Sequence, residues 1–194
     1  GVTPKKIAFI LCAGSRDNTG NAKPYCSRFC CMYSLKLAHL LKEHTGAEVF
    51  NFYIDMRTPG KGYEEFFQQS KGMGVSFIKG KIAKITQKDD NSGDLILRYE
   101  DVTTGALKEA KHDLVVLSVG VLPNNEITKV FTNQKLELDD QRFIKQVDEL
   151  VSPSLTSIEG VFVAGTAAGP KDIPDSILSA GSAASEAASY VNNL

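Results

Sequence analysis

The chain has 194 residues, 42% of them hydrophobic, which is enough to bury a core in one domain or two small ones. Its 22 Lys and Arg nearly balance its 23 Asp and Glu, which argues against nucleic acid or an anionic membrane as a partner. The apolar runs are far shorter than the roughly 20 residues of a membrane helix, and the start does not read as a secretion signal. We therefore expect a cytoplasmic protein with no membrane insertion.

The first third of the chain predicts a βαβ unit. Buried strands are expected at 6–12 and 47–54, and apolar side chains recur at helical spacing between them, over 26–43. Such a unit is parallel and right-handed. A short helix is expected next, at 63–71.

Three runs of strand character follow the short helix. They lie at 75–87, 94–99 and 107–111, with turn residues between them, and predict an antiparallel meander laid on the parallel core. A continuous apolar strand at 114–118 then returns to that core. This order of elements matches the pyridine-nucleotide domain of flavoproteins such as thioredoxin reductase. The expected fold for 1–118 is therefore α/β, a Rossmann-like domain of three layers.

Residues 119–194 resemble the C-terminal part of the FAD domain of the same flavoproteins. Strands are expected at 142–147 and 161–164, and a helix rich in small residues at about 175–191. An FAD domain also needs an opening strand and a Gly-x-Gly-x-x-Gly turn that holds the pyrophosphate. Because no such motif occurs in the 194 residues, we expect an incomplete FAD domain and a fragment of a larger protein.

The loop after the first strand departs from what NAD binding requires. A working NAD domain has its glycine-rich turn at this place, so that backbone groups reach the pyrophosphate. This chain has Cys-Ala-Gly-Ser-Arg-Asp at 12–17, and Cys12 with Arg16 cannot reproduce that turn. NAD binding is therefore not expected.

All four cysteines fall in the first sixth of the chain, at Cys12, Cys26, Cys30 and Cys31. A secreted disulfide scaffold would spread them, so the clustering indicates a metal, a cluster or redox chemistry. Cys12 ends a strand and faces the expected helix start, on which Cys26 and Cys30 would share one face. The spacing has neither paired zinc knuckles nor a ferredoxin run, and it excludes a catalytic Cys-x-x-Cys disulfide. An iron-sulfur cluster, a zinc ion and plain buried thiols all remain open.

Four motifs, in order, carry a resemblance that spans residues 6–190. They are Cys-Ala-Gly-Ser-Arg-Asp at 12–17, Tyr-Cys-Ser-Arg-Phe-Cys-Cys-Met at 25–32, Asp-Met-Arg-Thr-Pro-Gly-Lys-Gly-Tyr-Glu-Glu-Phe at 55–66 and Gly-Pro-Lys-Asp-Ile-Pro-Asp-Ser-Ile at 169–177. Together they resemble HdrA, the flavin-carrying and iron-sulfur-carrying component of CoB/CoM heterodisulfide reductase, and its relatives in methanogens and sulfate reducers. The resemblance implies an oxidoreductase in which FAD and [4Fe-4S] clusters pass electrons by flavin-based bifurcation. It also implies that Cys12, Cys26, Cys30 and Cys31 hold the cluster nearest the flavin.

The resemblance also implies a flavin-contacting segment. In related flavoproteins a strand, a turn and a helix start meet the ribityl chain and the ring, where the positive helix end stabilises an anionic reduced flavin. The expected contact residues are Gly165, Thr166, Ala167, Lys171, Asp172, Ile173 and Pro174. Thr166 stands where most such proteins have Asp, and Lys171 and Asp172 are equally compatible with a solvated surface.

The family implies other heterodisulfide reductase-type subunits and an electron-donating hydrogenase or dehydrogenase as partners. A homodimer through the small-residue helix is a further expectation. We expect the fragment to be inactive alone, and to lack FAD and the cluster when purified in air. Two alternatives stay open: an unconventional NAD(P)H-dependent flavoprotein reductase, and a non-catalytic zinc-binding scaffold of a redox complex.

Overall fold

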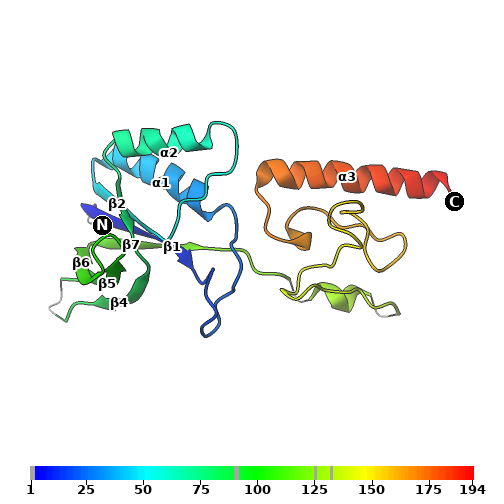
Figure 1. The fold of residues 1–194 in the computed structure, drawn as a ribbon, viewed down its shortest axis with the longest axis horizontal. Coiled ribbons are helices and arrows are strands. Elements are labelled where there is room, and N and C mark those ends of the chain that lie inside the picture. Colours follow the sequence, from blue (N-terminus) through cyan, green and yellow to red (C-terminus); the bar gives the residue numbers. More distant parts are fainter. Residues whose placement is uncertain (1–2, 90–91, 125, 132) are drawn as a thin grey trace. The chain divides into compact units, whose positions relative to one another are not determined.

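The computed structural model describes residues 3–89, 92–124, 126–131 and 133–194. Backbone contacts divide the chain into two units, Gly1–Gly120 and Val121–Leu194, and each is described by itself. The first unit contains strands β1 (Lys6–Ala13), β2 (Glu48–Tyr53), β3 (Ser76–Lys79), β4 (Ile82–Gln87), β5 (Leu95–Asp101), β6 (Ala106–His112) and β7 (Leu114–Val119), and helices α1 (Cys30–Thr45) and α2 (Tyr63–Gly72) (Figure 1).

The first unit has three layers, as the sequence predicts. A parallel sheet with the strand order β3-β2-β1-β7 forms the middle layer. Helices α1 and α2 lie on one face of this sheet, and the antiparallel meander β4-β5-β6 lies on the other (Figure 1). The predicted βαβ unit and the returning apolar strand are both confirmed.

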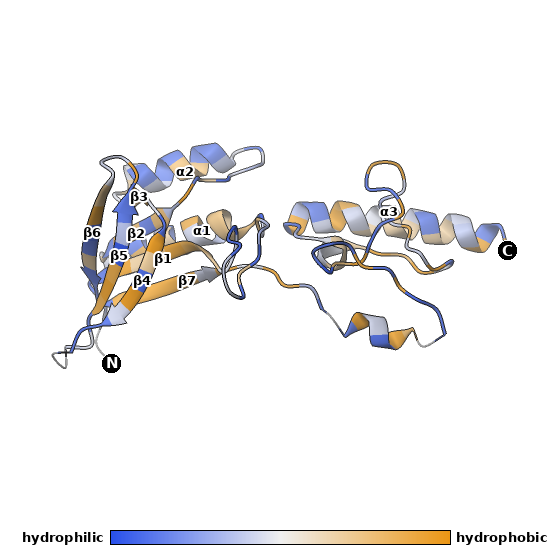
Figure 2. Ribbon diagram, turned by 60° about the horizontal axis from the view of Figure 1, so that its bottom comes forward, coloured by the Kyte–Doolittle hydropathy of each residue, from blue (hydrophilic) through white to orange (hydrophobic). Residues whose placement is uncertain are grey.

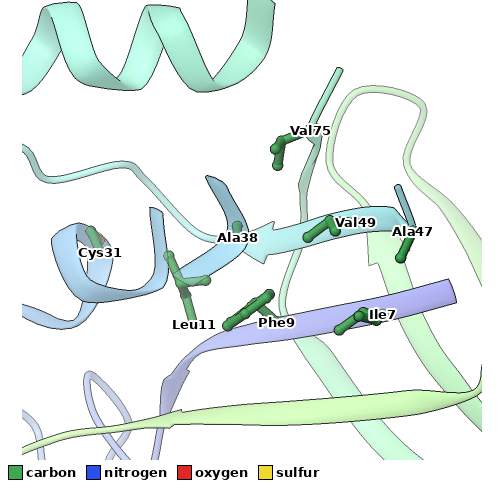
Figure 3. Close-up of a cluster of buried hydrophobic side chains, with 8 residues drawn as sticks. All are labelled: Ile7, Phe9, Leu11, Cys31, Ala38, Ala47, Val49 and Val75. Atoms are coloured by element: carbon green, nitrogen blue, oxygen red, sulfur yellow. The ribbon is translucent and has the colours of Figure 1, made fainter. Parts of the chain in front are cut away.

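Strand β1 is buried on both faces because helices cover one face of the middle layer and the meander covers the other (Figure 1). Figure 2 shows β1 and β7 in the orange of apolar residues, as is typical of parallel strands covered on both sides. Ile7, Phe9 and Leu11 belong to the cluster that packs against α1. Figure 3 shows that Cys31, at the start of α1, lies beside Leu11 in this cluster.

Phe52 on β2 packs between the parallel sheet and the meander. Its side chain is 1% exposed and lies in the cluster formed with Leu97 and Tyr99. The Phe52 ring meets Tyr99 edge to face with ring centroids 5.0 Å apart, and it meets His112 at 5.7 Å. Burial, and secondarily the charge of Lys6, lowers the pKa of His112, so this histidine packs as a neutral aromatic ring.

The sequence suggested that the run at 75–87 is a single strand of the meander, but the structure shows two strands there. The run divides at Gly80 into β3, which pairs with β2 in the parallel sheet, and β4, which pairs with β5. A Cβ atom at Gly80 would overlap the carbonyl oxygen of Glu100, so only glycine fits this close crossing. The sequence shows no cluster of turn residues there, which is why the division was missed.

The second unit contains two 3₁₀ turns, η1 (Ile127–Val130) and η2 (Gly165–Ala168), and helix α3 (Ile173–Asn192). The prediction of strands at 142–147 and 161–164 is wrong. The described residues form only isolated bridges there, Leu138 with Ile144 and Leu155 with Phe162. A strand needs a continuous partner for its backbone groups, and the described part of this unit provides none.

Helix α3 is confirmed, but it begins before the predicted start and includes Pro174 in its first turn. Asp172 caps it by accepting a hydrogen bond from the backbone N–H of Asp175 at 2.9 Å. The helix is held to its unit by polar contacts, such as Ser182 with Ser154 at 2.8 Å. Its exposed side chains include Ile173, Ile177, Leu178 and Val191. Its outward face is thus more apolar than a solvated helix requires.

None of the helices in the described ranges is both long enough and apolar enough to cross a membrane.

Candidate metal centre and flavin segment

Cys12 lies near the carboxyl end of β1, where the strand leaves its regular geometry. Its φ of 59° is left-handed, which is uncommon for a residue with a side chain. The pairing of β1 with β7 shifts register between Ile10 and Ala13. Such irregularities redirect side chains at the ends of strands. The turn at Cys12 therefore sets the direction of its thiol.

Cys26 lies in the segment before α1 and not on the helix, contrary to the sequence prediction. Helix α1 begins at Cys30, and Arg28 has a left-handed φ of 68° that no regular helix contains. Cys26 and Cys30 therefore do not share a helical face. In place of that arrangement, the sulfur of Cys26 accepts a hydrogen bond from the backbone N–H of Arg28 at 3.3 Å.

The four thiols come from a strand end, a loop and a helix start, and they lie within electrostatic range of one another. Burial raises the pKa of Cys30 to about 11, with smaller contributions from the charges of Cys31, Cys26 and Cys12. Burial likewise raises the pKa of Cys31, and the charges of Cys12 and Cys26 act in the same direction. All four cysteines are free thiols. The structure thus gathers all four predicted metal ligands at one end of β1.

The thiols are not arranged around a single ion. Within the described part of the chain, no three His, Cys, Asp or Glu side chains are close enough together to hold one metal ion. A zinc site places its four ligands around one centre. A cubic cluster is larger than one ion and takes each thiolate on a different iron, so its ligands stand farther apart. The donor set, four thiols and no His, is compatible with a cubic cluster and also with a zinc site of four cysteines.

A pair of buried serines joins the segments that carry Cys12 and Cys26. The hydroxyl oxygens of Ser15 and Ser27 are 3.1 Å apart and both side chains are buried. Gly120, which follows β7, packs directly on this pair, and a Cβ atom there would overlap both hydroxyl oxygens. Sequence reasoning missed these three residues, because serine and glycine in loops carry no signal of mutual contact.

We expect the substitution Gly120→Ala to destabilise the first unit by about 1–3 kcal/mol, because the added methyl group overpacks the serine pair. Gly181→Ala is the matched control, since a Cβ there meets nothing within 4 Å. In a helix this control should stabilise by about 0.5–1 kcal/mol. Urea unfolding followed by amide hydrogen exchange measures the free energy of unfolding of both variants. A Gly120→Ala protein as stable as the wild type would refute the close packing.

Helix α1 is also fixed to the end of β7. The hydroxyl of Tyr33 donates to the carbonyl oxygen of Val119 at 2.7 Å, and the thiol of Cys30 donates to the same oxygen at 3.6 Å. One turn further, the hydroxyl oxygens of Ser34 and Ser118 are 2.7 Å apart and fully buried. These contacts hold the helix start, and with it Cys30 and Cys31, against the sheet.

The segment expected to contact the flavin forms a turn followed by a helix start. Gly165, Thr166 and Ala167 lie in η2, and the backbone N–H of Gly165 donates to the hydroxyl of Ser179 on α3 at 3.1 Å. Thr166 and Ala167 are exposed, as are two further predicted contact residues at the start of α3, Ile173 and Pro174.

The two predicted tuning residues, Lys171 and Asp172, are half-buried just before α3. The carboxylate of Asp172 already caps the helix, so its first role is structural. Helix α3 begins at Ile173, so its positive end lies beside both residues. The unit thus presents backbone groups and a helix N-terminus on one exposed segment.

Comparisons with known proteins place the chain among its relatives. The chain is 43% identical over 187 residues to HdrA, the iron-sulfur component of the CoB–CoM heterodisulfide reductase of Methanocaldococcus jannaschii, covering 95% of this chain and 28% of that protein. It is 41% identical to the corresponding component of the H₂/formate:CoB-CoM heterodisulfide, ferredoxin reductase of Methanococcus maripaludis, covering 97% of this chain and 29% of that protein. The chain therefore spans less than a third of the length of these relatives.

The fold is that of thioredoxin reductase. The structure of the enzyme from T. acidophilum matches with a TM-score of 0.62 and 17% identity, over 97% of this chain and 53% of that one. Residues 57–187 match the sequence pattern of the pyridine nucleotide-disulphide oxidoreductases. Because that match covers more than half of its length, the chain belongs to the pyridine nucleotide-disulphide oxidoreductase family.

Proposed function

We propose that this chain is the part of an HdrA-like oxidoreductase, similar to that of heterodisulfide reductase, that passes electrons between FAD and a [4Fe-4S] cluster. The observation that carries this proposal is the gathering of Cys12, Cys26, Cys30 and Cys31 from three segments at the carboxyl end of β1. The similarity to proteins named as iron-sulfur subunits supports it. When bound, the cluster supplies one-electron transfer.

The surroundings of the thiols act on the thiolate form in two opposite directions. Without a metal, burial raises the pKa of Cys30 and Cys31, so both carry protons at neutral pH. Metal binding then releases these protons, because the ligand is the thiolate. The amino end of α1 and the N–H group of Arg28 both face this region of the chain and stabilise negative charge on sulfur.

We propose that residues 119–194 form the C-terminal part of an FAD-binding domain. The backbone of Gly165, Thr166 and Ala167, together with the helix start at Lys171, Asp172, Ile173 and Pro174, would meet the ribityl chain and the pyrimidine edge of FAD. The exposed apolar side chains on α3 support this proposal. Such a face is compatible with a missing half of the same domain that docks on it.

In the whole protein, the partners would be other heterodisulfide reductase-type subunits and a hydrogenase or formate dehydrogenase that donates electrons. This proposal rests on a relative whose name includes hydrogen, formate, heterodisulfide and ferredoxin. A protein with two electron donors and two acceptors in its name fits flavin-based bifurcation, in which one electron pair is divided between two acceptors of different potential.

We expect no measurable affinity for NAD(H) or NADP(H). The glycine-rich turn that would hold the pyrophosphate is replaced by residues 12–17. Within this loop Cys12 and Arg16 both have left-handed backbone conformations. A calorimetric titration tests this. Saturable binding tighter than about 100 µM, or roughly 5.5 kcal/mol, would favour the NAD(P)H reductase instead.

The ligand assignment is tested by changing each cysteine to serine in turn. After anaerobic reconstitution, each of Cys12→Ser, Cys26→Ser, Cys30→Ser and Cys31→Ser should retain less iron and sulfide than the wild type, because a hydroxyl is a poor ligand for iron in a cluster. Lys36→Ala, at an exposed position of the same helix, is the control and should load normally. Full iron and sulfide loading in all four serine variants would show that the cluster is not bound by these cysteines.

A further inference from the structure

The segment between two of the four cysteines is a loop that folds back on itself. We call residues 13–25, which lie between Cys12 and Cys26, the ligand loop. Three backbone hydrogen bonds of 2.9 or 3.1 Å join its two sides, from Arg16 to Tyr25, from Asp17 to Lys23, and from Lys23 to Gly14. The loop is thus closed by its own backbone, and its two ends, each next to a cysteine, are held together.

The backbone is strained in and beside the ligand loop. Cys12, Arg16 and Arg28 have left-handed φ angles of 59°, 56° and 68°. Among the residues that the structure describes, only one other non-glycine residue, Arg142, has a positive φ. Such conformations cost free energy in a residue with a side chain, and they persist only where surrounding contacts hold them. The strain therefore indicates that the loop is held by contacts beyond its own hydrogen bonds.

Two ion pairs supply such contacts and fix the ligand loop to the rest of the first unit. Arg16 pairs with Asp55, which follows β2, and Asp17 pairs with Lys81, which lies between β3 and β4. We call these two ion pairs the anchor pairs. The side chains of Arg16 and Asp17 are 20% and 23% exposed, so solvent screens both pairs incompletely.

The carboxylate of Asp17 connects the fold of the ligand loop to its anchor. One of its oxygens accepts hydrogen bonds from the backbone N–H of Thr19 at 2.8 Å and from the hydroxyl of Thr19 at 2.7 Å. Its other oxygen contacts the ammonium group of Lys81. Lys81, and secondarily Thr19, lower the pKa of Asp17, so the carboxylate keeps its charge at neutral pH.

We propose that the two anchor pairs keep the ligand loop folded before the cluster binds, so that Cys12 and Cys26 are already positioned as ligands. This inference rests on the proposed function. A loop that becomes ordered only on binding loses its conformational entropy at that moment, which weakens the binding. The residues of the anchor pairs are positioning residues, not ligands.

The first test is amide hydrogen exchange of the metal-free 194-residue chain, followed by nuclear magnetic resonance. The reporters are the N–H groups of Arg16, Asp17 and Lys23, which should be protected in the wild type. Lys81→Gln and Asp55→Asn each break one anchor pair and should make the reporters exchange about two- to fivefold faster, as expected for the loss of one ion pair. Both substitutions lie outside the loop, so the intrinsic exchange rates of the reporters stay the same.

Lys108→Gln is the matched control, because Lys108 pairs with Asp101 at 2.5 Å on the meander. The exposed fractions of that pair, 42% and 16%, are close to the 48% and 23% of Lys81 and Asp17. The reporters should exchange at the wild-type rate in Lys108→Gln. They should also do so in Lys81→Arg, which keeps the charge of the anchor pair.

The second test measures how fast the anaerobically reconstituted chain loses iron to the chelator bathophenanthroline disulfonate. Lys81→Gln and Asp55→Asn should lose iron faster than the wild type, whereas Lys81→Arg and Lys108→Gln should not. Unprotected reporters in the metal-free wild type would overturn the inference, as would wild-type rates of iron loss in both anchor variants. A wild-type chain that takes up no iron and sulfide would instead refute the proposed function, on which the exchange of the metal-free chain does not depend.

Discussion

If residues 119–194 are the proposed C-terminal part of an FAD-binding domain, FAD affinity is expected to rise by several orders of magnitude when the chain is mixed with the separately expressed first half of that domain. In the thioredoxin reductase fold that half holds the pyrophosphate on a glycine-rich turn at a helix start. Each such charge-assisted hydrogen bond contributes about 1.5–3 kcal/mol, and this chain has no turn of that kind. Fluorescence titration should find no FAD binding by the chain alone and a yellow, flavin-loaded complex after mixing.

The same experiment tests the docking face of α3. Ile177 and Leu178 are 67% and 72% exposed, so Ile177→Asp and Leu178→Asp should leave the chain folded but prevent complementation. Leu150→Asp, at a position 93% exposed and outside the helix, is the control and should complement normally. A chain that carries stoichiometric FAD by itself would show that the missing half is not required.

The substitution Phe52→Ala is expected to destabilise the first unit by about 3–5 kcal/mol. The ring is buried between the two sheets against Tyr99 and His112, where a truncated side chain would leave a cavity. Since domains are stable by only about 5–15 kcal/mol, a loss of this size would leave the unit close to unfolding.

Leu107→Ala on β6 is the control for Phe52→Ala. Leu107 is 79% exposed, so its truncation should change the free energy of unfolding by less than about 0.5 kcal/mol. Urea unfolding measures both variants. Equal stability losses would mean that Phe52 does not join the parallel sheet to the meander.

The first unit was predictable from the sequence because its core strands are strongly apolar and its turns are rich in glycine and polar residues. The prediction of strands failed where the local structure depends on residues that are distant in sequence. Phe162 lies in an apolar run typical of a strand, but the described residues pair with it only at Leu155. Gly80 follows the end of β3 at a point where the carbonyl oxygen of Glu100, distant in sequence, leaves no room for a side chain.

The four cysteines could be identified as one site because they are close in sequence, but their geometry could not. The apolar spacing of Phe29 and Tyr33 extends the helical pattern back toward Cys26, whereas the left-handed backbone of Arg28 interrupts it. The salt bridge between Arg16 and Asp55 could not be predicted for a different reason. The two residues are 39 positions apart, and only the parallel pairing of β1 with β2 brings their loops together.

The central claim is that Cys12, Cys26, Cys30 and Cys31 hold a [4Fe-4S] cluster. The most direct measurement is the iron, sulfide and zinc content of the wild-type chain after anaerobic reconstitution, together with its visible spectrum. Our account predicts about four irons and four sulfides per chain, and a broad thiolate-to-iron absorbance near roughly 400 nm. One zinc per chain, with no sulfide and no such absorbance, would contradict it and indicate a zinc-binding scaffold.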